Sequence, residues 1–178
     1  MTDYVVIAAA LLAGSLGGYL LARRRRVRGG PAEAVHRILL PFTGTEISRR
    51  ALDAALRLSR AEDATLMPAH LATVPNRLPL ECAIPRQAGQ AMPMLEAIEQ
   101  RATGQGVPVD ARIERGRSYR HALRRLLGQE SFDRVVVSAT ATGAAGLSGE
   151  DLVWLLEKAP AEVLILRPGP EDRRILTV

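Results

Sequence analysis

The residues of this chain that are best suited to bind a charged ligand lie in two loops, each of which follows a short apolar run. Both loops contain small side chains, and their glycines let backbone N–H groups approach phosphate oxygens closely. The candidate binding residues are Pro41, Thr43, Val137, Ser138, Ala141, Thr142, Gly143, Gly146 and Gly149. Residues of this kind could hold an anion, or the loops could serve only to connect strand to helix.

Residue patterns typical of catalysis are missing from the sequence. It has no Gly-x-Ser-x-Gly turn, no Walker lysine motif and no Cys–His pair. His36, His70 and His121 are too far apart to suggest a metal site, and Cys82 is the only cysteine, so no disulfide within the chain can form. Glu150 could act as an acid, but a glutamate at a helix start usually serves the helix dipole. We therefore expect neither catalytic residues nor a bound metal.

Apolar runs that alternate with amphipathic segments predict the elements that position these loops. The expected strands cover residues 37–42, 64–72, 109–114, 134–138 and 162–166. The expected helices cover residues 47–62, 93–103, 118–128 and 150–158, with a long loop at 73–90. Such alternation implies a parallel sheet covered by helices on both faces, with ligands beyond the carboxyl ends of the strands.

Two prolines and a serine affect the expected element boundaries. Pro68 weakens the second strand, because proline has no N–H to donate to a neighbouring strand. Pro93 suits the first turn of a helix, where a missing N–H costs nothing. Ser118 is expected to cap the helix that follows it.

Residues 4–22 form an uncharged run of nineteen residues that ends at an arginine block. At about 1.5 Å per residue, a helix of this length spans roughly 28 Å, close to the hydrocarbon thickness of a bilayer. Each arginine of this block would cost roughly 2.5–3.5 kcal/mol at the bilayer centre, so the span must end before it. The block contains Arg23, Arg24, Arg25, Arg26 and Arg28. We interpret residues 4–22 as a transmembrane helix, because a buried helix of a soluble domain would carry a polar face.

The charges around this span predict its orientation. A secretory signal carries its positive charge before the apolar run, whereas here the arginines follow it. The positive-inside rule then places residues 1–3 outside and residues 23–178 in the cytoplasm, with the chain held in the inner or plasma membrane. We expect a basic linker at 23–34 that contacts membrane lipid, a folded domain at 35–168 and a C-terminal tail at 169–178.

Gly14 and Gly18 form a Gly-x-x-x-Gly pair on one face of the expected span. Small residues at this spacing let two helices approach closely in lipid, so this face could hold a helix dimer. The same pattern also arises by chance in spans that are rich in alanine and glycine. The sequence leaves both interpretations open.

The formal net charge of +5 belongs mostly to the basic linker. Without its five arginines and without Asp3, 19 basic and 18 acidic side chains remain and nearly cancel. A further group of arginines between residues 115 and 125 is more typical of a solvated helix face than of a partner or lipid surface. Since a nucleic-acid-binding domain would carry a strongly basic patch, we expect no nucleic-acid partner.

Over roughly residues 35–168 the chain resembles the universal stress protein family. The resemblance rests on the segment 38–48, on Arg115-Gly116 before a helix, on Val135-Val136-Val137 before a glycine-rich loop, and on the closing segment 159–168. It implies a flavodoxin-like, doubly wound α/β fold with a five-stranded parallel sheet of order 3-2-1-4-5. It also implies a homodimer formed through the last strand and, as in many members, ATP binding.

The nucleotide motif that this resemblance implies is Gly-x-x-Gly, nine residues, and then Gly-Ser or Gly-Thr, with an acidic residue after the first strand. This chain has Ser138-Ala139-Thr140-Ala141 at the first glycines, Glu150 after Gly149, and Thr43 at the acidic position. Two like charges about 4 Å apart repel by roughly 4 kcal/mol at an effective dielectric near 20, so Glu150 should weaken ATP binding. Because the remaining hydroxyl groups could still hold an anion, ATP stays a possible cofactor.

Three functions are consistent with these observations. The first is a membrane-anchored, non-catalytic regulatory or stress-response domain that acts by dimerisation or by docking an unidentified protein partner. The second is an adenine-nucleotide sensor of the same fold, in which bound ATP shifts a dimer or partner equilibrium. The third, a hydrolase, lacks a supporting motif. We favour the first, because the fold pattern is intact, an anchor precedes it, and the phosphate loop departs from the nucleotide motif. An anchor that holds two copies at one membrane also raises their effective concentration.

Overall fold

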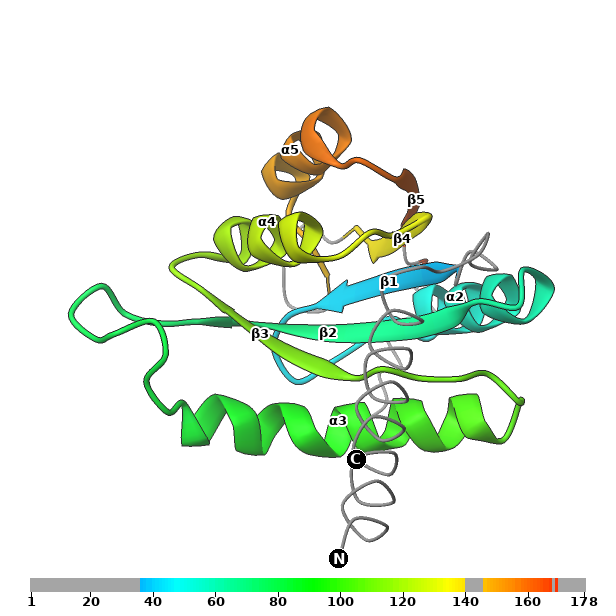
Figure 1. Ribbon diagram of the computed structural model, residues 1–178, viewed down its shortest axis with the longest axis horizontal. Coiled ribbons are helices and arrows are strands. Elements are labelled where there is room, and N and C mark those ends of the chain that lie inside the picture. Colours follow the sequence, from blue (N-terminus) through cyan, green and yellow to red (C-terminus); the bar gives the residue numbers. More distant parts are fainter. Residues whose placement is uncertain (1–35, 140–145, 168, 170–178) are drawn as a thin grey trace, which may run out of the picture. The chain divides into compact units, whose positions relative to one another are not determined.

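The computed structural model describes residues 36–139, 146–167 and 169 of the chain (Figure 1). The chain divides into two units, residues 1–35 and residues 36–178, and all described residues belong to the second. The expected transmembrane span at 4–22, with Gly14 and Gly18, and the basic linker therefore lie outside the described residues. Within the described part, no helix has both the length and the apolar character needed to cross a bilayer.

Strands and helices alternate along the described residues. The strands are β1 (Arg37–Phe42), β2 (Thr65–Thr73), β3 (Arg112–Gly116), β4 (Arg134–Ser138) and β5 (Glu162–Leu166). The helices are α2 (Arg49–Ala61), α3 (Pro85–Thr103), α4 (Tyr119–Gln129) and α5 (Gly149–Lys158). All strand pairs are parallel and the order in the sheet is β3-β2-β1-β4-β5. The expected flavodoxin-like sheet is therefore confirmed.

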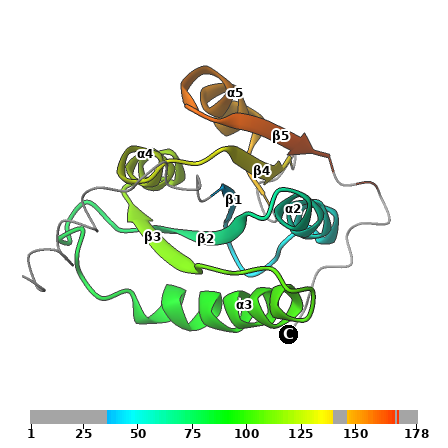
Figure 2. The same cartoon turned by 45° about the vertical axis from the view of Figure 1, so that its right-hand side comes forward.

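Helices cover both faces of the sheet. Figures 1 and 2 show α2 and α3 on one side of the strands and α4 and α5 on the other. This division follows from right-handed crossovers. The chain moves from β1 outward to β3 through α2 and α3, and then crosses back through α4 to β4 and through α5 to β5.

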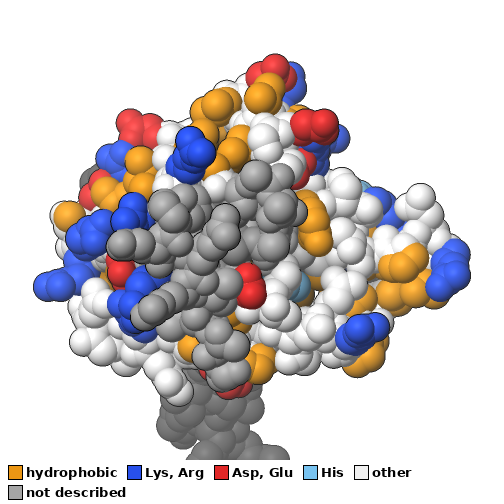
Figure 3. Space-filling model, turned by 180° about the vertical axis from the view of Figure 1, so that it is seen from behind, with side chains coloured by type: hydrophobic (Ala, Val, Ile, Leu, Met, Phe, Trp, Pro, Cys, Tyr) orange, Lys and Arg blue, Asp and Glu red, His pale blue; other side chains and the backbone are white. Residues whose placement is uncertain are grey.

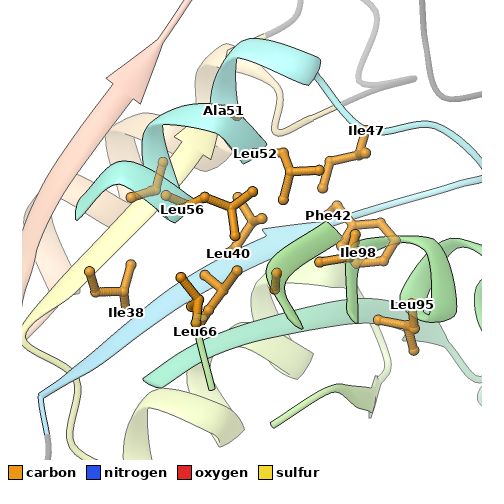
Figure 4. Packing of buried hydrophobic residues seen from close by; sticks show 14 of the residues in the cluster. Ile38, Leu40, Phe42, Ile47, Ala51, Leu52, Leu56, Leu66, Leu95 and Ile98 are labelled. Atoms are coloured by element: carbon orange, nitrogen blue, oxygen red, sulfur yellow. The ribbon is translucent and has the colours of Figure 1, made fainter. Parts of the chain in front are cut away.

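The central strand β1 contributes to a core on each face. Ile38, Leu40 and Phe42 pack with the buried faces of α2 and α3, as Figure 4 shows for the first of these cores. Leu39 points to the other face and packs with residues of α4 and α5. All four side chains are at most 1% exposed. Burial of one such side chain contributes about 1.5–3 kcal/mol to stability. A strand that is buried on both faces is therefore almost entirely apolar, as β1 is.

Helix α3 begins eight residues earlier than the sequence predicts. Pro85, rather than Pro93, occupies its first turn, and Pro93 lies inside the helix on its exposed side. The side-chain amide of Gln87 donates to the Thr73 carbonyl (2.8 Å) and accepts from the Thr73 N–H (3.0 Å), which holds the first turn of α3 against the end of β2. The prediction of a loop up to residue 90 is therefore wrong, because this contact is not local in sequence.

Strand β3 is also displaced from its expected position, and Pro68 explains the displacement. Val109 forms an isolated bridge with Leu66, but continuous pairing with β2 begins only at Arg112, opposite Ala69. In this register the next hydrogen bond from β2 would come from the N–H of residue 68, which a proline lacks. Pro68 is thus tolerated inside the sheet at a gap in the pairing between β2 and β3.

Candidate ligand-binding edge of the sheet

The strands β1 and β4 separate before they end. Their pairing stops at Leu39 opposite Val135, although β1 continues to Phe42 and β4 to Ser138. These neighbouring strands lead into helices on opposite faces of the sheet, which makes their carboxyl ends the topological switch point of the fold. Ligands of open α/β sheets bind at such points. We call the described residues there, 41–44, 138–139 and 146–148, the β1/β4 edge.

Pro41 accounts for the separation of the two strands. The Asp133 N–H donates to the carbonyl of Arg37 at 3.0 Å, so the odd-numbered residues of β1 direct their backbone groups toward β4. Residue 41 would be the next donor to β4 after Leu39, but a proline has no N–H. The residue that the sequence analysis placed in the binding loop thus ends the pairing at this point.

The loops after β1 and β4 meet at Gly146. The Thr43 hydroxyl donates to the Gly146 carbonyl at 3.4 Å, and Thr43 is only 2% exposed. A Cβ atom on residue 146 would lie 2.2 Å from the Ser138 carbonyl oxygen, so the close approach of the two segments requires glycine. The Leu147 N–H donates to that same oxygen at 2.9 Å. The fold thereby brings together Thr43, Ser138 and Gly146, three residues that the sequence analysis singled out.

The other predicted binding residues are placed differently. Val137 points into the core formed with α4 and α5, where it is fully buried. Gly149 is the first residue of α5. Ala141, Thr142 and Gly143 lie outside the described residues. Val137 therefore supports the edge through packing, and Gly149 lies at the start of the helix that follows the loop.

Two polar atoms near this edge are buried without a hydrogen-bond partner among the described residues. They are the hydroxyl oxygen of Ser138 and Nδ1 of His70, and both residues are 4% exposed. An unpaired buried polar atom costs about 1–3 kcal/mol, so most proteins avoid it. The Cβ of Ser138 lies 3.0 Å from the Cβ position built on Gly146, which shows that this side chain faces the loop after β4. A hydrogen-bonding ligand would supply the missing partners.

His70 is a residue of this region that the sequence analysis did not connect with the site. Its Nε2–H donates to the Gly44 carbonyl at 3.2 Å, and Gly44 has a left-handed φ of 70°. The imidazole also makes an edge-to-face contact with Phe42, with ring centroids 5.3 Å apart. Burial lowers the pKa of His70, although the hydrogen bond to Gly44 acts in the opposite direction. A neutral imidazole therefore fixes the turn after β1.

The first turn of α5 carries its own negative charge. The Ser148 hydroxyl accepts from the Asp151 N–H at 3.3 Å and donates to the Asp151 carboxylate at 2.6 Å. Arg120 of α4 donates to Asp151 at 2.5 Å and to Glu150 at 3.2 Å. Burial acts to raise the pKa of Asp151, but the hydrogen bonds from Ser148 and Arg120 outweigh it and hold this pKa below its ordinary value. The Asp151 carboxylate is thus ionised at neutral pH.

The arginines between residues 115 and 125 make contacts within the domain. Arg117 donates to the carbonyls of Val74 (3.3 Å), Pro75 (2.5 Å) and Leu78 (2.8 Å), which holds the loop after β2. The remaining members contact the carbonyl of Glu81 (Arg115), the carboxylates of α5 (Arg120), the ring of Trp154 (Arg124) and the carboxylate of Glu114 (Arg125). This basic cluster therefore stabilises the fold.

Charged residues occupy the opposite ends of the strands. A cleft of about 460 Å³ is lined there by His36, Glu62, Asp133, Arg134 and Glu162. Arg134 pairs with Glu62 and with Glu162, and His36 lies 3.5 Å from Asp133. In Figure 3 basic and acidic side chains lie beside one another on the left of the view. Because these charges pair with each other, we do not assign a ligand to this cleft.

Comparisons with known proteins agree with this architecture. The sequence model of the universal stress protein family matches residues 34–167. A universal stress protein family structure from Burkholderia pseudomallei has 20% identity and a TM-score of 0.57, and it covers 76% of this chain and 98% of its own. The universal stress protein UspA from Lactobacillus plantarum has 17% identity and a TM-score of 0.59, with coverages of 75% and 98%.

A solved plant structure is also similar to this chain. The Arabidopsis thaliana universal stress protein family structure with AMP bound has 12% identity and a TM-score of 0.56, and it covers 77% of this chain and 94% of its own. No curated protein sequence matches the chain. The structural similarities establish the fold, and the family match, which spans three quarters of the chain, establishes the relationship. The chain belongs to the universal stress protein family.

Proposed function

We propose that this chain is a membrane-tethered, non-catalytic regulatory domain that works by self-association through β5 and α5. The observation that carries the proposal is the uncharged part of β5, which is an edge strand among the described residues. Its residues Val163–Leu166 are all partly or fully exposed, and Leu164 is 39% exposed. Val153 and Leu156 on α5 are 58% and 60% exposed. An exposed apolar edge strand readily pairs with a second copy of itself.

The other edge of the sheet supports this choice of surface. β3 carries Arg112, Glu114 and Arg115 among its five residues, and Glu114 pairs with Arg125 at 3.2 Å. Charged side chains on an edge strand oppose pairing with another strand. The two edge strands therefore differ in charge, which decides whether an edge can pair with another strand. Of the two, β5 is the edge suited to a homodimer.

The engagement of two imidazoles supports a non-catalytic role. His70 donates to the Gly44 carbonyl, and Nδ1 of His121 accepts from the Arg117 N–H at 3.1 Å. Both rings thus hold backbone turns in place. The sequence adds the tether: a span at 4–22 would confine the domain to the cytoplasmic face of the membrane, where lipid contacts of the basic linker and a helix dimer through Gly14 and Gly18 would assist pairing.

Sedimentation of the full-length chain in detergent micelles tests this proposal. We expect wild-type dimers, and we expect Leu164→Arg or Leu156→Arg to weaken the dimer at least tenfold, because a charge is buried at the interface. Met92→Arg is the matched control, since Met92 is 46% exposed on α3, away from β5. A monomeric wild type, or dimers that all three substitutions leave equally stable, would overturn the proposal.

Adenine-nucleotide sensing at the β1/β4 edge is the second candidate function. It is favoured by the unpaired buried atoms of Ser138 and His70 and by the early separation of β1 and β4. Similar universal stress protein structures hold cAMP, AMP or dAMP. Titration calorimetry of the full-length chain with AMP and with ATP tests it. Saturable binding of either ligand supports this function, and the absence of binding at millimolar ligand rejects it.

A further inference from the structure

We infer that Glu150 makes the β1/β4 edge selective for adenine ligands of low phosphate charge, so that adenosine or a monophosphate binds better than ATP. This inference rests on the second candidate function, nucleotide sensing. It concerns which ligand class the edge accepts and which side chain decides it. Three features of the described residues carry it.

The first feature is the position of α5. It is the helix that follows β4, and it begins at Gly149, three residues after the Gly146 carbonyl that contacts Thr43. A helix N-terminus that opens at a topological switch point is the usual place for a ligand phosphate, because its N–H groups and its dipole favour negative charge. Phosphates of a ligand held between β1 and β4 would therefore lie near the first turn of α5.

The second feature is the charge already present in that turn. Glu150 and Asp151 contribute two carboxylates, and Arg120 is the positive side chain that pairs with both of them. The Asp151 side chain is 19% exposed and strongly hydrogen-bonded, whereas the Glu150 side chain is 91% exposed. The partial positive charge at the N-terminus of α5 is thus compensated by the carboxylates of its own first turn. Each additional phosphate charge would meet a first turn whose net charge is negative. Within that turn, the Glu150 carboxylate is the one exposed to solvent.

The third feature is the uncharged character of the rest of the edge. Residues 41–44, 138–139 and 146–148 carry no charged side chain, and Pro41 leaves β1 and β4 unpaired beyond Leu39. Ser138 has a buried hydroxyl without a partner among the described residues. Neutral donors and acceptors of this kind suit the base and ribose of a nucleoside, whose polar atoms are themselves uncharged. The edge therefore offers hydrogen bonds to the nucleoside and repulsion to a long phosphate chain.

The alternative is that Glu150 only stabilises the start of α5. An acidic residue in a first helical turn contributes to helix stability through the dipole, whatever ligand binds nearby. The two roles differ in a measurable way. A purely structural Glu150 would change the affinity for adenosine and for ATP by the same factor, whereas a selective Glu150 changes the affinity for ATP alone.

Calorimetric titrations of the full-length chain with adenosine, AMP, ADP and ATP separate these roles. They are carried out at low ionic strength and without magnesium, which would neutralise part of the phosphate charge. For the wild type we expect adenosine and AMP to bind better than ADP, and ADP better than ATP. Glu150→Gln should raise the affinity for ATP roughly 5- to 10-fold, a size that allows for solvent screening of an exposed charge, and leave adenosine within twofold.

Glu157→Gln is the matched control, because it removes the same charge from an exposed position near the other end of α5. It should leave all four affinities unchanged. If the wild type prefers ATP to AMP, or if Glu150→Gln shifts adenosine and ATP equally, the inference is wrong while nucleotide sensing stands. If no adenine ligand binds to the wild type or to Glu150→Gln, nucleotide sensing and the inference are both rejected.

Discussion

The two ends of the strands in this sheet satisfy their polar groups in different ways. At the amino ends, Glu130 accepts from Arg37 and from Arg112, and Arg134 bridges Glu62 and Glu162. At the carboxyl ends, the hydroxyl of Ser138 and Nδ1 of His70 are buried without partners among the described residues. The cleft at the amino ends is therefore not the better candidate for a ligand site, because its charged side chains already pair with one another. The paired charges at the amino ends serve stability, whereas the unpaired atoms at the β1/β4 edge are those that the proposed nucleotide site would use.

The largest effect should come from Gly146→Ala at the β1/β4 edge. A methyl group there would lie 2.2 Å from the Ser138 carbonyl oxygen, so the loop would have to move, and we expect a loss of about 1–3 kcal/mol in unfolding free energy. Urea unfolding followed by the fluorescence of Trp154, the single tryptophan, measures it. Gly149→Ala is the control, because a Cβ there meets no atom within 4 Å. Equal stability of the two variants would contradict the close packing of this edge.

The next effect tests the amino ends. The Glu130 side chain is 15% exposed and is held between Arg37 and Arg112. Arg112 donates hydrogen bonds to Asp110 and to Glu130, and these raise the pKa of Arg112. Glu130→Gln should cost about 1–2 kcal/mol, because both guanidinium groups lose an ionic partner. High salt should reduce the difference. The exposed Glu99→Gln on α3 should change stability by less than about 0.5 kcal/mol, and a similar loss in both variants would disprove the assigned role.

A smaller effect should appear as a pH dependence of stability. Burial holds the pKa of His70 below its ordinary value of 6.5, so as the pH falls the unfolded chain takes up this proton before the folded one does. The contribution of His70 to stability is therefore fully present above pH 6.5 and is lost as the pH falls toward the folded pKa. Unfolding free energies measured between pH 8 and pH 5 should fall less in His70→Gln than in the wild type. His36→Gln, at the exposed amino end, is the control.

The smallest effect should separate a paired serine from an unpaired one. Ser48 and Ser138 are both buried, but the Ser48 hydroxyl accepts from the Ala51 N–H at the start of α2. We expect Ser48→Ala to cost about 1 kcal/mol and Ser138→Ala to change stability by less than about 0.5 kcal/mol in the absence of ligand. The same unfolding assay measures both variants. A large loss in Ser138→Ala would show that this hydroxyl has a partner, and would remove an argument for a ligand at the β1/β4 edge.

Much of the fold follows from local sequence patterns. The strands at 37–42, 134–138 and 162–166 are observed as predicted, because each is built on a short apolar run that is too brief for a helix. Ser118 caps α4 as expected, with its hydroxyl accepting from the His121 N–H at 3.2 Å. Such caps depend on residues three positions apart, so the sequence alone can reveal them.

The misplaced boundaries have non-local causes. The start of α3 depends on Gln87 binding the backbone of Thr73, and the start of β3 depends on Pro68 in the strand beside it. His70 was overlooked because its sequence neighbours are apolar. Its partner Gly44 is 26 residues away, in the turn after β1. A one-dimensional pattern carries no information about such pairs.

By itself the sequence determined the alternation of strands and helices, the parallel sheet, and the loops in which a ligand site should be sought. These properties depend on periodicity, on caps and on apolar runs, which act over a few residues. The tertiary structure decided which polar groups meet: Thr43 reaches Gly146 across 103 residues, and Arg120 reaches Asp151 across 31. The physical reason is that hydrogen bonds and ion pairs act over a few ångströms, so their partners are known only once packing has brought distant segments together.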